Sequence, residues 1–412
     1  MTLSQPDFFY ENEPIWKNYL PLIEKLSDGD TPKYIWDIPY TINQLSYLSH
    51  SHFRYYGKFP SVVAGQVIDE YYPKNSKRPI FDNFCGSGTT LVEASLRNIQ
   101  SVGVDVSWLS CLSSNVKVTH INLDDVSNLL NKIQTRFEPT FLNELSEREE
   151  KWFEPNAIAS LKTIQKKLLE FEINDEVKFL IIAFLAIIRR TSRAFDAEVR
   201  PHINKNKKYR DPLGAFTKKV NDMIRNHKAF QSFTSPKNKH ECLLGDAREV
   251  SKFYNYDPPA LVISHPPYLN AFNYSPVFSL EYMWGQPFEK ALFKNLDFQK
   301  RELVAHPANE KNIKNYFDFL SLAYKETYDL QKKGDTLAIV IGDCTRNKQL
   351  IPVIDTLIDT VSNIGYVPIA INYRTTHYGT GKYAYNTRAN YHKGVNAKKD
   401  GILIFRKCFY KF

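Results

Sequence analysis

The chain has 412 residues, 43% of them hydrophobic, which is too long for one minimal domain and predicts a large domain with an elaboration. Its five cysteines form no CxxC pair and no His/Cys cluster with zinc-ligand spacing, which argues against a disulfide framework and predicts no metal site. The formal net charge of +9 favours a polyanionic partner, since lysine and arginine neutralise phosphates, although solubility alone also explains such a charge.

The sequence shows no sign of export or membrane insertion. The opening residues, MTLSQPDFFYENEP, lack the basic and apolar regions of a signal peptide. The most apolar run, Phe179–Ile188, is ten residues long and therefore too short to cross a bilayer. We expect a soluble, cytoplasmic protein with no membrane partner.

In chain order, residues 1–50 are polar, aromatic and proline-containing, and we expect a loosely structured N-terminal arm with short helices. Helical periodicity follows Pro60 and ends at Tyr72-Pro73. A βαβ unit comes next, and it implies a parallel sheet with a right-handed crossover. Its predicted parts are a strand at Arg78–Phe84, a glycine turn at Cys85–Gly88, a helix at Thr89–Leu96 and a strand at Ser101–Asp105.

Residues 112–236 show no strand pattern, and their amphipathic and apolar helical patterns indicate a helical insertion. The catalytic domain would therefore comprise residues 51–111 and 237–412. Strands are predicted at 242–246, 260–264, 335–341, 367–373 and 401–405, and helices at 310–331 and 350–364. The fold class is α/β: a seven-stranded, mostly parallel Rossmann-like sheet with an antiparallel final strand, split between its second and third strands by the insertion.

The segment Phe84-x-Gly86-x-Gly88 has the character of a ligand-binding turn. Glycines permit a sharp turn and close approach of a ligand, and the following helix presents free N–H groups. The loop reads Gly86-Ser87-Gly88-Thr89-Thr90 and lacks the third glycine of a dinucleotide-binding loop. This sequence favours a methionine-type ligand over a pyrophosphate. Asp105, at the end of the next strand, can accept hydrogen bonds from ribose hydroxyls, and Asp246 ends a third strand where an adenine edge would lie.

The turn His265-Pro266-Pro267-Tyr268 follows an apolar strand and should face the ligand crevice. An enzyme that modifies a base amine must extrude the base and supply acceptors for the amine N–H groups. The Pro266 carbonyl and the His265 side chain would be those acceptors, and Tyr268 would stack on the base. A turn that only terminates the strand is the alternative interpretation.

These segments resemble the bacterial DNA amino-methyltransferases, which make N4-methylcytosine or N6-methyladenine. In that family the cofactor loop reads DPFCGSGTT, where this chain has Asp82-Asn83-Phe84-Cys85-Gly86-Ser87-Gly88-Thr89-Thr90, and the catalytic motif reads (D/N/S)PP(Y/F/W). The similarity extends over roughly residues 50–110 and 240–408. It implies S-adenosyl-L-methionine as cofactor, with Lys58, Phe59 and Pro60 beside its methionine end.

Two residues depart from the family pattern. Asn83 replaces a proline, and His265 stands where the family has serine, aspartate or asparagine. The surrounding pattern resembles the members of the family whose motif reads Ser-Pro-Pro-Tyr, called the SPPY enzymes. It favours cytosine N4 as the methylated atom, with adenine N6 as the alternative. Because imidazolium cannot accept an amine N–H, we expect the rate to fall as the pH drops through the histidine pKa.

Double-stranded DNA is the expected substrate, and three regions are candidates for contacting it: the insertion, the segment after the catalytic turn, and the basic, aromatic segment between the last two strands. The predicted DNA-binding residues are Asn270, Tyr274, Arg189, Arg190, Arg193, Arg374, Lys382, Arg388 and Lys393.

Two other functions remain open: an RNA amino-methyltransferase, and a catalytically silent DNA-binding relative. A cognate restriction endonuclease is a candidate partner for the main interpretation, and association with the nucleoid is expected from it. The sequence does not determine the recognition site or the oligomeric state.

Overall fold

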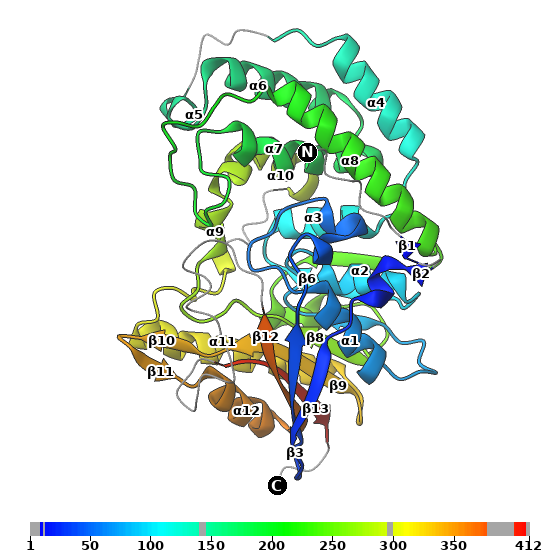
Figure 1. The fold of residues 1–412 in the computed structure, drawn as a ribbon, viewed down its shortest axis with the longest axis vertical. Helices are drawn as coiled ribbons and strands as arrows, with labels where there is room; N and C mark the ends of the chain where they lie inside the picture. The colour runs from blue at the N-terminus through cyan, green and yellow to red at the C-terminus, as the bar shows by residue number, and fades with distance from the viewer. Residues whose placement is uncertain (1–8, 11–12, 140–145, 295–299, 377–398, 409–412) are drawn as a thin grey trace.

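The computed structural model describes residues 9–10, 13–139, 146–294, 300–376 and 399–408. Within these ranges, nine strands form one sheet in the order β3-β4-β12-β13-β9-β8-β5-β6-β7 (Figure 1). The strands are β3 (Leu22–Ser27), β4 (Lys33–Ile38), β5 (Ile80–Asp82), β6 (Ser101–Asp105), β7 (His240–Leu244), β8 (Leu261–Ser264), β9 (Thr336–Gly342), β12 (Tyr366–Thr376) and β13 (Asp400–Lys407).

The seven strands from β12 to β7 form the predicted Rossmann-like sheet. Strands β9, β8, β5, β6 and β7 pair in parallel, and β13 runs antiparallel between β9 and β12. The chain order starts in the middle of the sheet, at β5, and reverses direction at the β5–β8 boundary. Such a reversal opens a crevice at the carboxyl ends of the strands.

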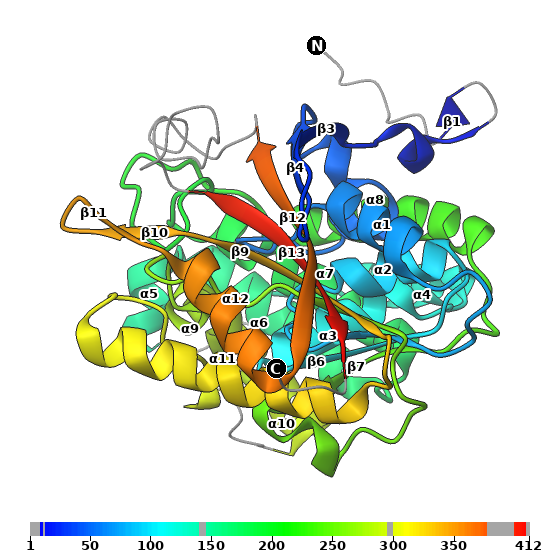
Figure 2. The same cartoon turned by 90° about the horizontal axis from the view of Figure 1, so that it is seen from below.

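Helices cover both faces of the sheet. On one face, α1 (Ser61–Tyr71) packs on alternate residues of β5, β8, β9 and β13. On the other face, α11 (Glu310–Leu330) and α12 (Val353–Ile364) pack with the 3₁₀ helix η4 (Ala247–Lys252) (Figure 2). The two remaining crossover helices are α2 (Thr89–Leu96) and α3 (Trp108–Val118). The bounds of α2 and β6 are those predicted from the sequence.

Residues between β6 and β7 are helical, and in Figure 1 α4–α8 form a layer above the sheet. These helices are α4 (Leu123–Thr135), α5 (Glu147–Trp152), α6 (Pro155–Glu170), α7 (Asp175–Thr191) and α8 (Pro212–Phe233). The apolar α7 lies at the centre of their core. Helix α10 (Ser279–Phe293), which follows the short α9 (Tyr274–Val277), packs into the same core, so the segment after β8 and the helical layer are one packed unit.

The N-terminal region differs from the expected loose arm. Strand β4 pairs in parallel with β12, and β3 pairs antiparallel with β4. Ile35, Trp36 and Ile38 of β4 are buried. The physical reason is that β12 would otherwise be an open edge strand, and β4 satisfies its backbone groups. Short elements complete this region and a hairpin after β9: β1 (Phe9–Tyr10), β2 (Glu13–Pro14), η1 (Ile15–Asn18), η2 (Gln44–Ser46), η3 (Leu48–Ser51), β10 (Cys344–Arg346) and β11 (Gln349–Ile351).

This arrangement predicts that the N-terminal strands contribute to stability. Trp36→Ala should lower the free energy of unfolding by about 3–5 kcal/mol, because the 1% exposed indole leaves a cavity against the sheet. Leu22→Ala on the neighbouring β3 is the control, since Leu22 is 62% exposed and its loss should change stability by less than about 0.5 kcal/mol. Urea denaturation of both variants tests this, and equal small effects would mean that β4 does not stabilise the sheet.

Candidate active site

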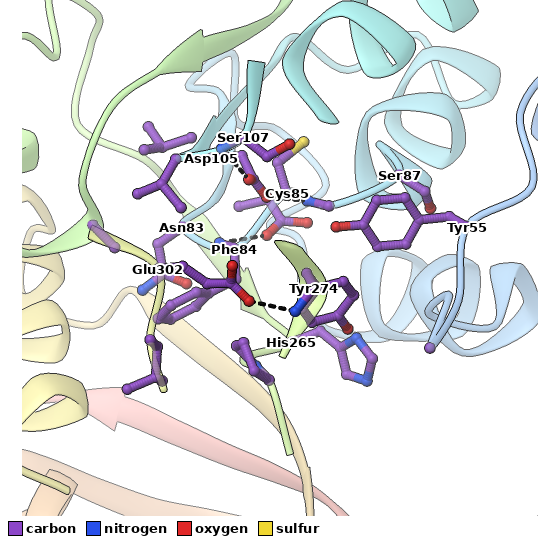
Figure 3. Close-up of a pocket in the computed structure, with 18 of the residues that line it drawn as sticks. Tyr55, Asn83, Phe84, Cys85, Ser87, Asp105, Ser107, His265, Tyr274 and Glu302 are labelled. Atoms are coloured by element: carbon purple, nitrogen blue, oxygen red, sulfur yellow. Dashed lines mark hydrogen bonds between the residues drawn. The ribbon is translucent and has the colours of Figure 1, made fainter. Parts of the chain in front are cut away.

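A pocket lies in the crevice at the carboxyl ends of β5, β6 and β8, with about 880 Å³ of empty space when the solvent at its mouth is included. Its wall combines the glycine loop after β5, the residues that end β6, the catalytic turn after β8, and two segments far apart in sequence, residues 55–59 and 301–303. The pocket therefore joins the two motifs that the sequence analysis identified separately. Figure 3 shows Asp105 and Ser107 at one end of it and Tyr274 and His265 at the other.

The glycine loop has the conformation that its sequence predicts. Gly86 and Gly88 have φ values of 51° and 74°, in the left-handed region that favours glycine. A Cβ on Gly88 would lie 2.8 Å from the Ser114 Cβ and 3.0 Å from its Cα. The Lys117 ammonium, fully buried, donates to the Ser87 carbonyl at 2.6 Å, and burial lowers its pKa well below the usual value. Lys117 thus holds the loop from beneath.

Asp105 ties the loop to the end of β6. Its two carboxylate oxygens accept the backbone N–H groups of Gly86 and Ser107, both at 2.8 Å (Figure 3). Burial raises the Asp105 pKa to about 6, although the two N–H groups oppose this shift by stabilising the carboxylate. Each carboxylate oxygen has a second lone pair, so Asp105 can still accept hydrogen bonds from a ligand.

Two other charged groups line the pocket with shifted pKa values. Burial raises the pKa of Asp82 to about 7, and the Asp82 carboxylate accepts the Phe84 N–H at 3.0 Å. Burial lowers the pKa of Lys58 to about 7, and its ammonium donates to the His50 carbonyl at 3.3 Å. Each shift favours the neutral form, because little water reaches these groups.

The catalytic turn places His265 against the segment predicted to lie beside the methionine end of the cofactor. The His265 ring stacks on Phe59 with centroids 5.1 Å apart and meets Tyr268 edge to face at 5.4 Å. Burial, assisted by the positive charge of Arg374, lowers the His265 pKa to about 3. The imidazole is then neutral at every working pH. The fall in rate expected near the ordinary histidine pKa is therefore corrected: His265 loses its acceptor only far below that pH.

The prolines of the turn have different environments. The Pro267 carbonyl accepts the Tyr316 hydroxyl at 2.8 Å, which fixes the turn against α11. Within the described residues, the Pro266 carbonyl accepts no hydrogen bond. The described residues therefore leave its acceptor capacity unused.

A buried network holds Tyr268. The Tyr268 hydroxyl donates to Asp400 at 2.8 Å, and Arg374 forms an ion pair with the same carboxylate. Arg374 and Asp400 stand near the facing ends of β12 and β13, so the network links the catalytic turn to this edge of the sheet. Arg374 is only 8% exposed, which corrects its predicted role in binding DNA: its charge is used inside the protein.

Ten of the predicted site residues line the pocket: Lys58, Phe59, Asp82, Phe84, Gly86, Thr89, Asp105, His265, Pro267 and Tyr274. Pro60, Gly88, Thr90, Pro266 and Tyr268 are neighbours of these residues and support the wall. Asp246 lies beside the pocket without lining it, and its carboxylate is 3.6 Å from Arg301, which does line it. Its carboxylate is buried and paired with Arg248 at 2.6 Å, while Gly245 and Ala247 on either side of it face the pocket.

Some of the predicted DNA-binding residues are buried and others are exposed. Arg189 is 6% exposed and donates to Tyr56 and to the carbonyls of Glu198 and Val199, so its predicted contact with DNA is corrected to a structural role. Arg190 is exposed, and Arg193 pairs with Glu154. The Asn270 side chain bonds the backbone of Thr345 and Ala308. Lys382, Arg388 and Lys393 lie outside the described residues.

Glu302, which no sequence pattern predicted, lines the pocket and accepts the backbone N–H of Tyr274 (Figure 3). Glu302 also accepts the Ser275 N–H at 3.0 Å. The Asn273 side chain fastens the same two segments, since its oxygen accepts the N–H groups of Ala305 and His306 at 3.1 Å. No local pattern signals this position, because only the fold brings residues 300–306 to the turn.

Two further observations concern metals and membranes. No group of three or more His, Cys, Asp or Glu residues suited to a metal occurs in the described ranges. Among the helices that the structure describes, none combines the length and apolar character needed to span a bilayer.

Comparison with known proteins adds a family likeness. The chain is 25% identical over 197 residues to the Type II methyltransferase M.MvaI of Kocuria varians, a match that covers 43% of this chain and 42% of that protein. It is 24% identical over 380 residues to the Type II methyltransferase M.BsoBI of Geobacillus stearothermophilus, covering 81% and 73%. No family model matches the sequence.

A solved structure with some likeness is a putative DNA modification methylase from Thermus thermophilus complexed with S-adenosyl-L-methionine. It is 19% identical, and the match covers 41% of this chain and 56% of that one with a TM-score of 0.25. At so low a TM-score, the strand order itself remains the evidence for the fold.

The glycine loop yields a stability prediction. Gly88→Ala should destabilise the protein by roughly 2–4 kcal/mol, because it combines a positive φ with the overlap against Ser114. Gly334→Ala is a matched control: φ is 83° there, but nothing lies within 4 Å of the added Cβ, so only about 1 kcal/mol should be lost. Chemical denaturation measures the free energy of unfolding of both variants. Equal losses would show that Ser114 moves away from the added Cβ at no cost in stability.

Proposed function

We propose that the protein is an S-adenosylmethionine-dependent DNA methyltransferase that acts on an exocyclic amino group, with cytosine N4 favoured over adenine N6. The observation that carries this proposal is the shared pocket: Asp105 and the glycine loop line it together with His265 of the HPPY turn. The likeness to two Type II methyltransferases, one of them over 81% of this chain, supports the assignment. The first relative is matched over only 42% of its length, so activity and substrate rest on the site.

The residues of the pocket fit the proposed cofactor. Asp105 would accept the ribose hydroxyls, and Phe84, Ala247 and Phe319 offer apolar walls for the adenine. Lys58 would meet the methionine carboxylate, whose charge would raise the lowered pKa of the ammonium. When bound, S-adenosylmethionine supplies an electrophilic methyl group.

The catalytic turn would hold the target amine. Neutral His265 and the Pro266 carbonyl provide two acceptors for the amine N–H groups, and Tyr268 provides a ring to stack on the extruded base. Stacking on Phe59 fixes the imidazole plane, and the bond to Asp400 fixes the tyrosine. Orientation of the amine nitrogen is then the chief catalytic contribution of the chain. In the SPPY enzymes a serine stands at the position of His265. The likeness of the surrounding pattern to those enzymes is the basis for favouring cytosine N4.

The test is transfer of a tritiated methyl group from S-adenosylmethionine to unmodified duplex DNA, with tRNA as the competing substrate. We expect incorporation into DNA, with N4-methylcytosine found by mass spectrometry of the nucleosides. His265→Ala should lower turnover roughly tenfold, since it removes one acceptor. Between about pH 5.5 and 8, wild type and His265→Ser should share one pH profile, because the imidazole remains neutral throughout this range.

Each alternative gives its own result in this assay. Incorporation into tRNA alone would contradict the proposal and favour an RNA amino-methyltransferase. Binding of DNA without incorporation would favour a catalytically silent relative, and N6-methyladenine would correct only the choice of base. Full activity of His265→Ala would remove the imidazole from the mechanism.

Cofactor affinity should depend on pH through the two acids in the pocket. The pKa values of Asp105 and Asp82 are raised to about 6 and about 7, so both carboxylates are ionised above these values and gain protons as the pH falls. Lys58, with a pKa of about 7, gains its charge over the upper part of this range and opposes the effect of Asp82, so the clear fall in affinity for S-adenosylhomocysteine, measured by calorimetry, should come below about pH 6.5, where Lys58 is protonated and Asp105 gains its proton. Asp105→Asn should lower affinity about tenfold and flatten the change near pH 6.

Asp82→Asn is the matched control, since it should leave the change near pH 6 in place. An Asp105→Asn variant that bound the ligand like wild type at every pH would show that Asp105 does not contact the ribose.

A further inference from the structure

A second hollow opens between residues 53–56 and the helical layer, with about 800 Å³ of empty space when the solvent at its mouth is included. Four arginines and two acids supply its charges, and we call it the arginine cleft. These residues are Arg54, Arg189, Arg190, Arg210, Asp196 and Glu281.

The arginine cleft shares walls with the candidate active site. Tyr55 lines the active-site pocket, whereas its neighbours Arg54 and Tyr56 line the cleft. The same alternation occurs on α10, where Tyr282 lines the pocket and Glu281 the cleft. Two segments therefore contribute neighbouring residues to both hollows.

The charges of the cleft do not cancel. Arg189 lies 3.7 Å from Glu281, and this buried pair is neutral as a whole. The Asp196 carboxylate is bound by both Lys207 and Arg210, each at 2.7 Å. Arg54 and Arg190 therefore remain as excess positive charge at the exposed part of the cleft.

These two arginines differ in how firmly they are held. The Arg54 guanidinium lies over the Tyr56 ring at 4.9 Å and donates to the Asp196 carbonyl, which orients it before any ligand arrives. In the part of the chain that the structure describes, the Arg190 guanidinium makes no hydrogen bond or ion pair. Its five donors are thus available to an anion.

We infer that the arginine cleft binds a backbone phosphate of the DNA strand whose base enters the active site, with Arg54 and Arg190 as the principal ligands. The inference rests on the proposed function, because phosphates flank an extruded base on the same strand. Guanidinium groups bind phosphate oxygens through paired, charge-assisted hydrogen bonds. Such a contact carries no sequence information but fixes the strand relative to the adjacent pocket.

The test measures binding of a fluorescent random-sequence duplex of about 30 base pairs by anisotropy, between about 50 and 200 mM salt. Arg54→Ala and Arg190→Ala should each weaken binding roughly five- to tenfold and reduce the slope of log K against log salt by about 1. Arg190→Lys should keep most of the salt slope, because it retains the charge. Cofactor affinity should stay within about twofold of wild type, since neither side chain lines the pocket.

Arg225→Ala is the matched control: Arg225 is an exposed arginine of α8, paired with Asp222 and outside the cleft, and its loss should leave DNA binding unchanged. Wild-type affinity and slope in both cleft variants, or an equal loss in Arg225→Ala, would overturn the assignment. The same measurement is made with an RNA probe of equal length. If the cleft variants lose binding to RNA but keep binding to the DNA duplex, the assignment to DNA is overturned. If the variants lose DNA binding while wild type transfers no methyl group to DNA, the proposed function fails and the phosphate site stands.

Discussion

The arrangement of the site depends on the buried carboxylate of Asp105. It accepts one N–H from the glycine loop and one from the residue that starts the turn after β6, and so fixes two strand ends relative to each other. A carboxylate placed there by a parallel sheet reaches both, because adjacent parallel strands end at the same edge. Lys117 completes this constraint from the opposite side of the loop, through the Ser87 carbonyl.

Burial governs the electrostatics around this constraint. It raises the pKa values of Asp82 and Asp105 and lowers those of Lys58 and His265. All four shifts move the groups toward neutrality, as expected where charged forms lose hydration. A ligand that brings its own charges into such a pocket changes the protonation of the wall as it binds. For a chemistry that needs His265 as an acceptor, the lowered pKa is favourable.

The helical layer is positioned as firmly as the sheet. Helix α10 follows the catalytic turn and packs into the core built around α7, and the Arg189–Glu281 pair crosses that interface. Side chains on the layer therefore keep a defined distance from the pocket. For the proposed phosphate contact this packing matters, since such a contact is useful only if its position relative to the reacting base is set.

Local sequence determined the β5–α2–β6 unit, the conformation of the glycine loop and the existence of the HPPY turn. These features follow from short-range causes: hydrophobic periodicity, the φ values open to glycine, and the rigidity of proline. Tertiary structure alone decided which charges are available. Arg189 and Arg374 pair with Glu281 and Asp400, and Asp246 pairs with Arg248. Glu302 reaches the pocket because hydrogen bonds hold residues 300–306 against the turn. Most of these partners lie far apart in the chain. The sequence around a basic residue therefore does not show whether its partner is an acid of the same protein or a phosphate of a ligand.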